Sequence, residues 1–247
     1  FNTSFGMTVN NLAGGTIDVQ SGTVQLSPTT FNNNGVVNVA AGAVMNINNT
    51  GTAGSGAGDY TIAGTVNLTN GVQGFNAGAD ISGTGAFRVA GGTMTVNAPM
   101  SADNLQLVSG LINGGASAAD VLTIDSSLVW SGGAMQGSGA TTVANTASLS
   151  FSGSPSLTTR TFTNQSPSGV WSGAGTLDVG GTFNNAGTLV ATGDGIVRSN
   201  SGTGIFNNSG VFRKSGTTGS TTFNTSFGMT VNNLAGGTID VQSGTVQ

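Results

Sequence analysis

Residues 223–247, at the end of the chain, repeat residues 1–25 letter for letter. So long an identity does not arise by chance, and a shared fold alone would let surface positions diverge. We therefore interpret residues 1–222 as one complete repeat unit and residues 223–247 as the start of the next identical unit. Duplication of such a block is typical of proteins in which length and surface matter more than a single reactive site.

A shorter period runs inside the long one. Apolar (Φ) and polar residues alternate in short runs bounded by glycine, in the pattern G-x-Φ-x-Φ-x-x-G. Such alternation indicates a strand with both apolar side chains on one face, and the glycines permit the turns that close it. The pattern predicts inward-pointing side chains at Ile17, Val19, Val37, Val39, Val66, Leu68, Leu177, Val179 and Leu189.

The spacing of these runs favours one fold. An apolar-Asn-Asn triplet recurs at intervals of 22, 23 and 25 residues, with about three short strands between copies. Coils of about 22–25 residues favour an all-β, right-handed parallel β-helix (β-solenoid) over antiparallel hairpins or immunoglobulin-like domains. One unit would hold roughly ten coils, stacked at the inter-strand spacing. The pattern weakens across residues 43–160, where we expect loops at 51–59 and 114–120.

The Asn pairs of the triplets have a predicted structural role. Stacked in successive coils, their amides can hydrogen-bond along the axis as ladders, and Asn also tolerates tight turns. The predicted ladder residues are Asn10, Asn11, Asn32, Asn33, Asn184, Asn185, Asn207, Asn208, Asn232 and Asn233.

Composition restricts the chemistry. The chain has no His and no Cys, and its five basic residues against nine acidic ones give a net charge of −4. We therefore predict no catalytic residues, no metal site and no cofactor, because the usual nucleophile–base pairs and zinc ligands are missing. Five cations are too few for nucleic acid, and no apolar stretch in this segment is long enough to span a membrane.

Several phrases resemble a known group of proteins. The segments VNNLAGGTIDVQSGTVQL (9–26), VWSGGAMQGSGATTV (129–143), VWSGAGTLDVGGTFNNAGTL (170–189) and FNNSGVFRKSGTTGSTTF (206–223) look like repeats of giant bacterial extracellular proteins, akin to filamentous-haemagglutinin and autotransporter-passenger β-helices. The resemblance implies an extracellular or cell-surface location on a bacterium. It brings no catalytic residues.

Together these features predict a non-catalytic structural repeat of a long extracellular or cell-surface filament. Its main partner would be itself, through end-to-end stacking of adjacent units that are tandemly linked or self-associating. One alternative is an adhesin rod that binds surface glycans, in which Trp130 and Trp171 would stack on sugar rings, or that carries a binding loop near residues 50–60 or 71–82. A second alternative is a carbohydrate-active β-helix enzyme, which would need carboxylates converging on one face.

Overall fold

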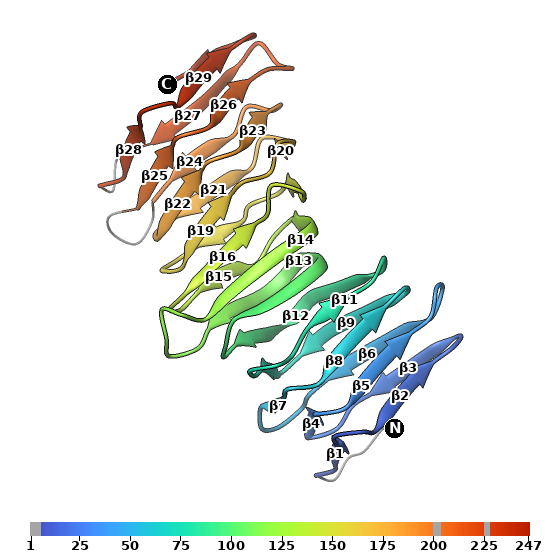
Figure 1. The fold of residues 1–247 in the computed structure, drawn as a ribbon. Helices are drawn as coiled ribbons and strands as arrows, with labels where there is room; N and C mark the ends of the chain where they lie inside the picture. Colours follow the sequence, from blue (N-terminus) through green and yellow to red (C-terminus); the bar gives the residue numbers. More distant parts are fainter. Residues whose placement is uncertain (1–5, 200–203, 225–227) are drawn as a thin grey trace.

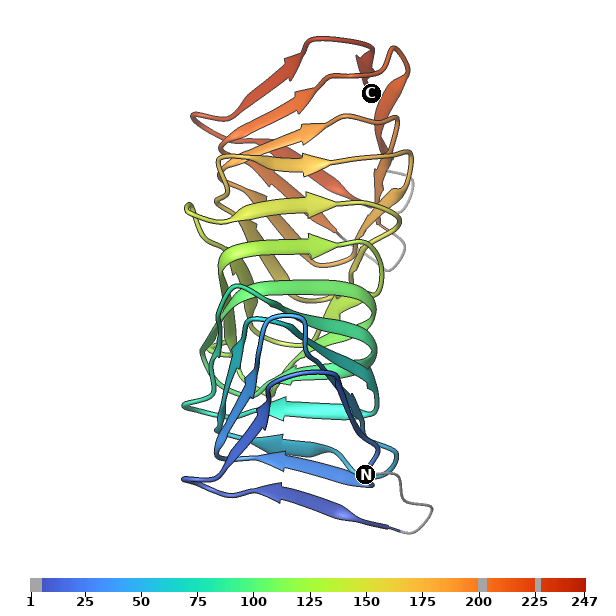
Figure 2. The same ribbon diagram turned by 90° about the vertical axis from the view of Figure 1, so that its right-hand side faces the viewer.

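The computed structural model describes residues 6–199, 204–224 and 228–247. In this part of the chain every regular element is a strand, and every strand pairing is parallel. The strands stack as a β-solenoid of about 11 turns, with about 21 residues in each coil. The two ends of the chain lie at opposite ends of the stack (Figures 1 and 2). The predicted parallel β-solenoid is therefore confirmed.

Each coil contributes one strand to each of three faces. The first face contains β1 (Thr8–Asn11), β4 (Thr30–Asn33), β7 (Gly54–Gly56), β10 (Val72–Phe75), β15 (Ala134–Gln136), β18 (Ser156–Leu157), β21 (Thr176–Val179), β24 (Ile196–Arg198), β27 (Ser220–Asn224) and β30 (Thr245–Val246). The second face contains β2 (Thr16–Val19), β5 (Val36–Val39), β8 (Asp59–Ile62), β11 (Ile81–Ser82), β16 (Ala140–Val143), β19 (Thr161–Asn164), β22 (Thr182–Asn185), β25 (Ile205–Asn208) and β28 (Thr230–Asn233).

The third face contains β3 (Thr23–Leu26), β6 (Val44–Asn48), β9 (Thr65–Asn70), β17 (Ser148–Phe151), β20 (Gly169–Trp171), β23 (Thr188–Ala191), β26 (Val211–Lys214) and β29 (Thr238–Val241). Three longer strands continue around the corners between faces. They are β12 (Ala86–Val96), β13 (Met100–Gly114) and β14 (Val121–Trp130), and they carry the stack through the middle of the chain.

Coil length varies more than the sequence pattern predicts. Among the shortest coils is the one that separates the paired residues Phe87 and Leu105, and among the longest is the one that separates Val211 and Thr238. The linking residues at the corners differ in number, and register shifts interrupt the pairings of β12 with β13, of β13 with β14 and of β6 with β9. The short coils fall among β12 to β14, where strand follows strand with few linking residues.

The core fills the space between the three faces. Eight of the nine predicted inward residues are buried, and Ile17 is partly buried against the core. Aromatic rings form a column through the C-terminal half, with ring centroids 5.0 Å apart for Phe162 and Phe183 and 5.1 Å apart for Phe183 and Phe206. The same kind of contact thus recurs from coil to coil, as the alternating pattern predicts.

One of the two predicted loops is wrong. The Gly-rich segment 51–59 contains β7, which lies over β4 on the first face, and only residues 51–53 and 57–58 fall outside strands. A Cβ on Gly54 or Gly56 would collide with the carbonyl oxygens of Phe31 and Asn33, so glycine lets this strand approach its neighbour closely. Beyond Gly114, residues 115–120 do form a connection between β13 and β14.

The two copies of the duplicated sequence form the same local structure. TVNN and TIDV are strands in both, as β1 and β2 in the first copy and as β28 and β29 in the second. Gly22 and its counterpart Gly244 both have φ of 69°. The second copy pairs with the coil formed by residues 205–221.

Candidate functional site

The Asn pairs form two kinds of hydrogen-bonded ladder. In each TVNN or FNN strand the first Asn faces outward and the second faces inward. The inward Asn side chains are buried at a corner of the coil, where Asn185 is fully buried and Asn208 is 1% exposed. An inner ladder and an outer ladder therefore run side by side along the axis.

The inner ladder satisfies both amide hydrogens of its buried members Asn185 and Asn208. Nδ2 of Asn185 donates to Oδ1 of Asn208 at 2.8 Å and to the carbonyl oxygen of Val211 at 3.0 Å. Asn208 repeats this arrangement one coil further, donating to Asn233 at 2.8 Å and to the carbonyl oxygen of Thr238 at 3.0 Å. Each side chain thus links two coils and also fixes the start of the next strand, which removes the cost of a buried unpaired amide.

The outer ladder runs in the opposite sense. Nδ2 of Asn232 donates to Asn207 at 2.9 Å, and Nδ2 of Asn207 donates to Asn184 at 2.9 Å, so these amides point toward the N-terminal end. The same sense holds for Asn32 and Asn10 at 2.9 Å. Because these side chains are at least partly open to water, their bonds contribute less to stability than those of the inner ladder.

The ten predicted ladder residues do not form one continuous stack. The four N-terminal members, Asn10, Asn11, Asn32 and Asn33, lie on β1 and β4 of the first face. The six C-terminal members lie on β22, β25 and β28 of the second face. The sequence did not single out Asn164, which extends the inner ladder by donating to Asn185 at 2.8 Å. Its strand, TFTN, keeps only the second Asn of the motif.

The two Trp side chains belong to the core. Trp130 and Trp171 are 0% and 1% exposed. Trp130 packs against Phe151, with ring centroids 5.6 Å apart. Both rings belong to the aromatic column that continues through Phe162, Phe183 and Phe206. The hypothesis that these residues stack on sugar rings is therefore wrong, because no sugar can reach either indole face without opening the coil. Side chains alternate between inside and outside along β14 and β20, and both Trp residues occupy inward positions.

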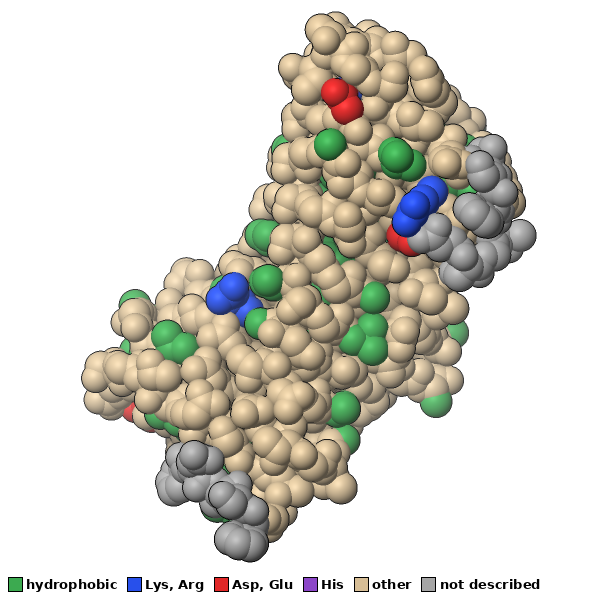
Figure 3. Space-filling model, turned by 180° about the vertical axis from the view of Figure 1, so that it is seen from behind, with side chains coloured by type: hydrophobic (Ala, Val, Ile, Leu, Met, Phe, Trp, Pro, Cys, Tyr) green, Lys and Arg blue, Asp and Glu red, His purple; other side chains and the backbone are tan. Residues whose placement is uncertain are grey.

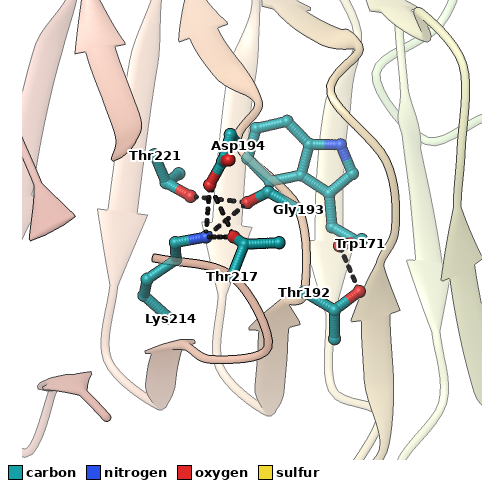
Figure 4. A network of polar contacts seen from close by, with 7 residues as sticks. All are labelled: Trp171, Thr192, Gly193, Asp194, Lys214, Thr217 and Thr221. Atoms are coloured by element: carbon teal, nitrogen blue, oxygen red, sulfur yellow. Dashed lines mark hydrogen bonds and ion pairs between the residues drawn. The ribbon is translucent and has the colours of Figure 1, made fainter. Parts of the chain in front are cut away.

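Two cations are buried as hubs of hydrogen bonds, and the sequence pattern did not reveal either. Lys214 has a fully buried side chain whose Nζ donates to the carbonyl oxygen of Gly193 at 2.7 Å, to Asp194 at 2.9 Å and to the Thr217 hydroxyl (Figure 4). The hydroxyl of Thr217, followed by Lys214, holds the pKa of the Asp194 carboxyl below its usual range. All three ammonium hydrogens have acceptors, so Lys214 ties a corner loop to the coil below it.

The second hub is Arg160, which is fully buried. Its guanidinium donates to the hydroxyl of Thr141 at 2.9 Å and to the carbonyl oxygens of Ser138, Asp120 and Ala140 at 2.7, 3.0 and 2.6 Å. Burial lowers the pKa of Arg160 to about 10, and the nearby charge of Asp120 opposes the shift. The guanidinium thus joins three successive coils.

Three carboxylates, Asp80, Asp103 and Asp125, lie on successive coils close enough to influence one another electrostatically. Partial desolvation raises the pKa of Asp125, although the residue is exposed overall, and the charges of Asp103 and Asp80 raise it further. Asp103 accepts a hydrogen bond from the backbone of Gly83 at 2.7 Å, and Asp80 accepts one from Ser101. In residues 6–199, 204–224 and 228–247 no group of three or more acidic side chains is placed to hold a metal ion, and no pocket is present.

The surface carries little charge. One side of the molecule shows a few charged side chains scattered over an uncharged background (Figure 3). The candidate binding segments 50–60 and 71–82 contain one aromatic residue each, Tyr60 and Phe75, and both are 1% exposed. Within the part of the chain that the structure describes, there is no helix that could span a membrane.

Comparison with known protein families, curated proteins and solved structures finds no match to this chain. The site that the structure itself offers is therefore the coil-to-coil contact: the Asn ladders, the aromatic column and the buried cation hubs.

Proposed function

We propose that this chain is a structural, non-catalytic repeat unit of a long filament, in which adjacent units stack end to end. One observation carries the proposal. The second copy of the duplicated sequence continues all three faces in register, with β28 on β25, β29 on β26 and β30 on β27. A unit that ends by starting its own sequence again, without interrupting the stack, can be extended indefinitely.

The contacts suit a load-bearing rod. Backbone hydrogen bonds between parallel strands run along the axis on three faces, so axial tension is shared among many bonds in each coil. The inner Asn ladder adds further bonds in the same direction, such as Asn185 to Asn208 at 2.8 Å. With 5 basic and 9 acidic residues in 247, salt has little charge to screen.

The location that we propose, outside the cell or on its surface, rests on the resemblance of residues 9–26 and 170–189 to bacterial exoprotein repeats. The adhesin alternative loses its main support because Trp130 and Trp171 are buried. The enzyme alternative gains no support from Asp80, Asp103 and Asp125, because no pocket lies beside them and the side-chain hydrogen bonds of Asp80 and Asp103 come from Ser101 and the backbone of Gly83.

The test is to express chains that contain one, two and three copies of residues 1–222 and to measure particle length by electron microscopy. Each copy should add about 50 Å at constant width, since one copy spans ten turns and a fraction at about 4.8 Å per turn. A matched control carries Asn185→Asp, Asn208→Asp and Phe206→Asp in every copy, which should break the stack at one level per copy. Particles that stay compact as copies are added would refute the proposal.

A further inference from the structure

The last coil of the chain has an uncovered edge made of β28, β29 and β30. Three apolar side chains of this coil are open to water, with Val231 36% exposed, Ile239 43% and Val241 47%, whereas their counterparts Val9 and Ile17 in the first copy are partly buried. In the identical first copy, Val19 corresponds to Val241 and is only 3% exposed. The side of these strands that the following coil covers in the first copy is therefore open in the second copy.

In the first copy, the structure shows which residues cover the corresponding strands. Residues 30–48 form the next coil and pair in register with it: Phe31 lies beside Val9, Val37 beside Ile17, and Met45 beside Val24. Phe31, Val37 and Met45 are all completely buried. The chain thus already contains the interface that fits the uncovered edge, because residues 230–246 present the sequence that residues 30–48 cover.

The two copies nevertheless occupy different faces. TVNN is β1 on the first face but β28 on the second, where it pairs with β25. TIDV is β2 on the second face but β29 on the third, where it pairs with β26. From β1 to β28 the chain makes ten full turns and then advances by one further face. The repeat unit, residues 1–222, therefore does not contain a whole number of coils.

We propose that the edge of β28, β29 and β30 binds residues 26–48 of a further copy of this chain, and that each copy is thereby turned by one third of a turn about the rod axis. The proposal rests on the proposed function and adds its geometry. Any surface feature of one copy reappears on the next face in the following copy, about 50 Å along the axis. Three copies are needed before the feature returns to its original face.

The one-face advance has a consequence for binding along the rod. The outer amide ladder lies on the first face at Asn10 and Asn32 and on the second face at Asn184 and Asn207. Repetition with this advance places both ladder segments on all three faces in turn. The rod then offers the same surface in three directions to neighbouring rods, which suits lateral association into bundles.

The coverage of the edge is tested by adding a copy of residues 26–48 after Gln247. Alternate backbone N–H groups of an edge strand point toward the missing neighbour. We expect amide hydrogen exchange in residues 230–246 to slow at least tenfold in the extended chain. A control extension carries Phe31→Asp, Val37→Asp and Met45→Asp in the added segment and should leave exchange unchanged. Equal exchange in the plain chain and the unmutated extension would overturn the proposal.

The rotation is tested by disulfide trapping in the 247-residue chain, which contains no cysteine of its own. Arg213 and Asp240 are paired and outward-facing, so Arg213→Cys with Asp240→Cys should form an intramolecular disulfide under mild oxidation. If both copies placed TIDV on the same face, residues 238–241 would lie on the second face, over β25, instead. Asn207→Cys with Asp240→Cys would then form the bond. Formation of the 207–240 bond, or of neither, contradicts the one-face advance.

These outcomes separate the two proposals. If the 213–240 bond forms and the extension protects the edge, but multi-copy chains do not lengthen, the filament is wrong and the edge assignment survives. If multi-copy chains lengthen while the 207–240 bond forms, the filament stands and the rotation is wrong.

Discussion

The inner Asn ladder allows a sharp test, because adjacent residues of β22 differ only in the side they face. Asn185 is fully buried and takes part in three side-chain hydrogen bonds, with Asn164, Asn208 and the carbonyl oxygen of Val211. Asn184 faces outward and is half-buried, with a bond to Asn207 at 2.9 Å and a longer one to Thr163 at 3.4 Å.

The expected cost of Asn185→Ala follows from these contacts. A hydrogen bond contributes about 1 kcal/mol net, and a buried polar atom left without its partner costs about 1–3 kcal/mol. Asn185→Ala removes three bonds and leaves Oδ1 of the buried Asn208 without the donor that Asn185 supplies. We expect it to lower the free energy of unfolding by about 3–5 kcal/mol. Asn184→Ala should lower it by about 1 kcal/mol or less.

Equilibrium unfolding in guanidinium chloride, followed by circular dichroism, compares the two variants. The variants should share the slope of the wild-type transition and differ in its midpoint. Equal midpoints for Asn185→Ala and Asn184→Ala would refute the reasoning, because burial would then make no difference to the ladder.

Three further predictions concern the core and the charged groups. Trp171→Ala should cost about 3–5 kcal/mol by opening a cavity, whereas Val170→Ala, whose side chain is 37% exposed on the same strand, should be nearly neutral in the same unfolding assay. Asp125 has a raised pKa in the folded state, so its ionisation opposes folding and stability falls as pH rises above the unfolded value near 4. Asp125→Asn should therefore raise the thermal midpoint at pH 7 and leave it unchanged at pH 3; a lower midpoint at pH 7 would contradict this. Trypsin should not cut the folded chain after Arg160, which is completely buried, and early cleavage there and at Arg88, seen by mass spectrometry, would contradict the coil packing.

Much of the fold follows from local pattern. Alternation alone placed Val37, Val39, Val66 and Leu68 inward, because successive side chains of a strand point to opposite sides. The same alternation also indicates that one charged residue, Lys214, points inward. In β26, Phe212 and Lys214 share the inward parity, so the Lys214 side chain had to be buried, and only the carbonyl of Gly193 and the side chains of Asp194 and Thr217 make that possible.

The one-face advance could not be predicted in this way. It depends on the number of strands in a unit, and the pattern disappears where β12, β13 and β14 pass around corners without a glycine-bounded turn at each one. The coil that joins the paired residues Phe87 and Leu105 in this region is among the shortest in the stack. Since corner lengths vary from coil to coil, the spacing of Asn pairs at the two ends does not determine how many faces lie between them. The buried Arg160 hub depends on three coils at once and leaves no local signature.

The central claim is that the chain is one unit of a long filament, and the native material tests it most directly. Electron microscopy and fibre diffraction of that material should show uniform thin fibres with a meridional spacing of about 4.8 Å. We predict an axial repeat of about 50 Å for one unit and about 150 Å for three units, the distance after which the faces coincide again. A compact, monodisperse particle without an axial repeat would contradict it.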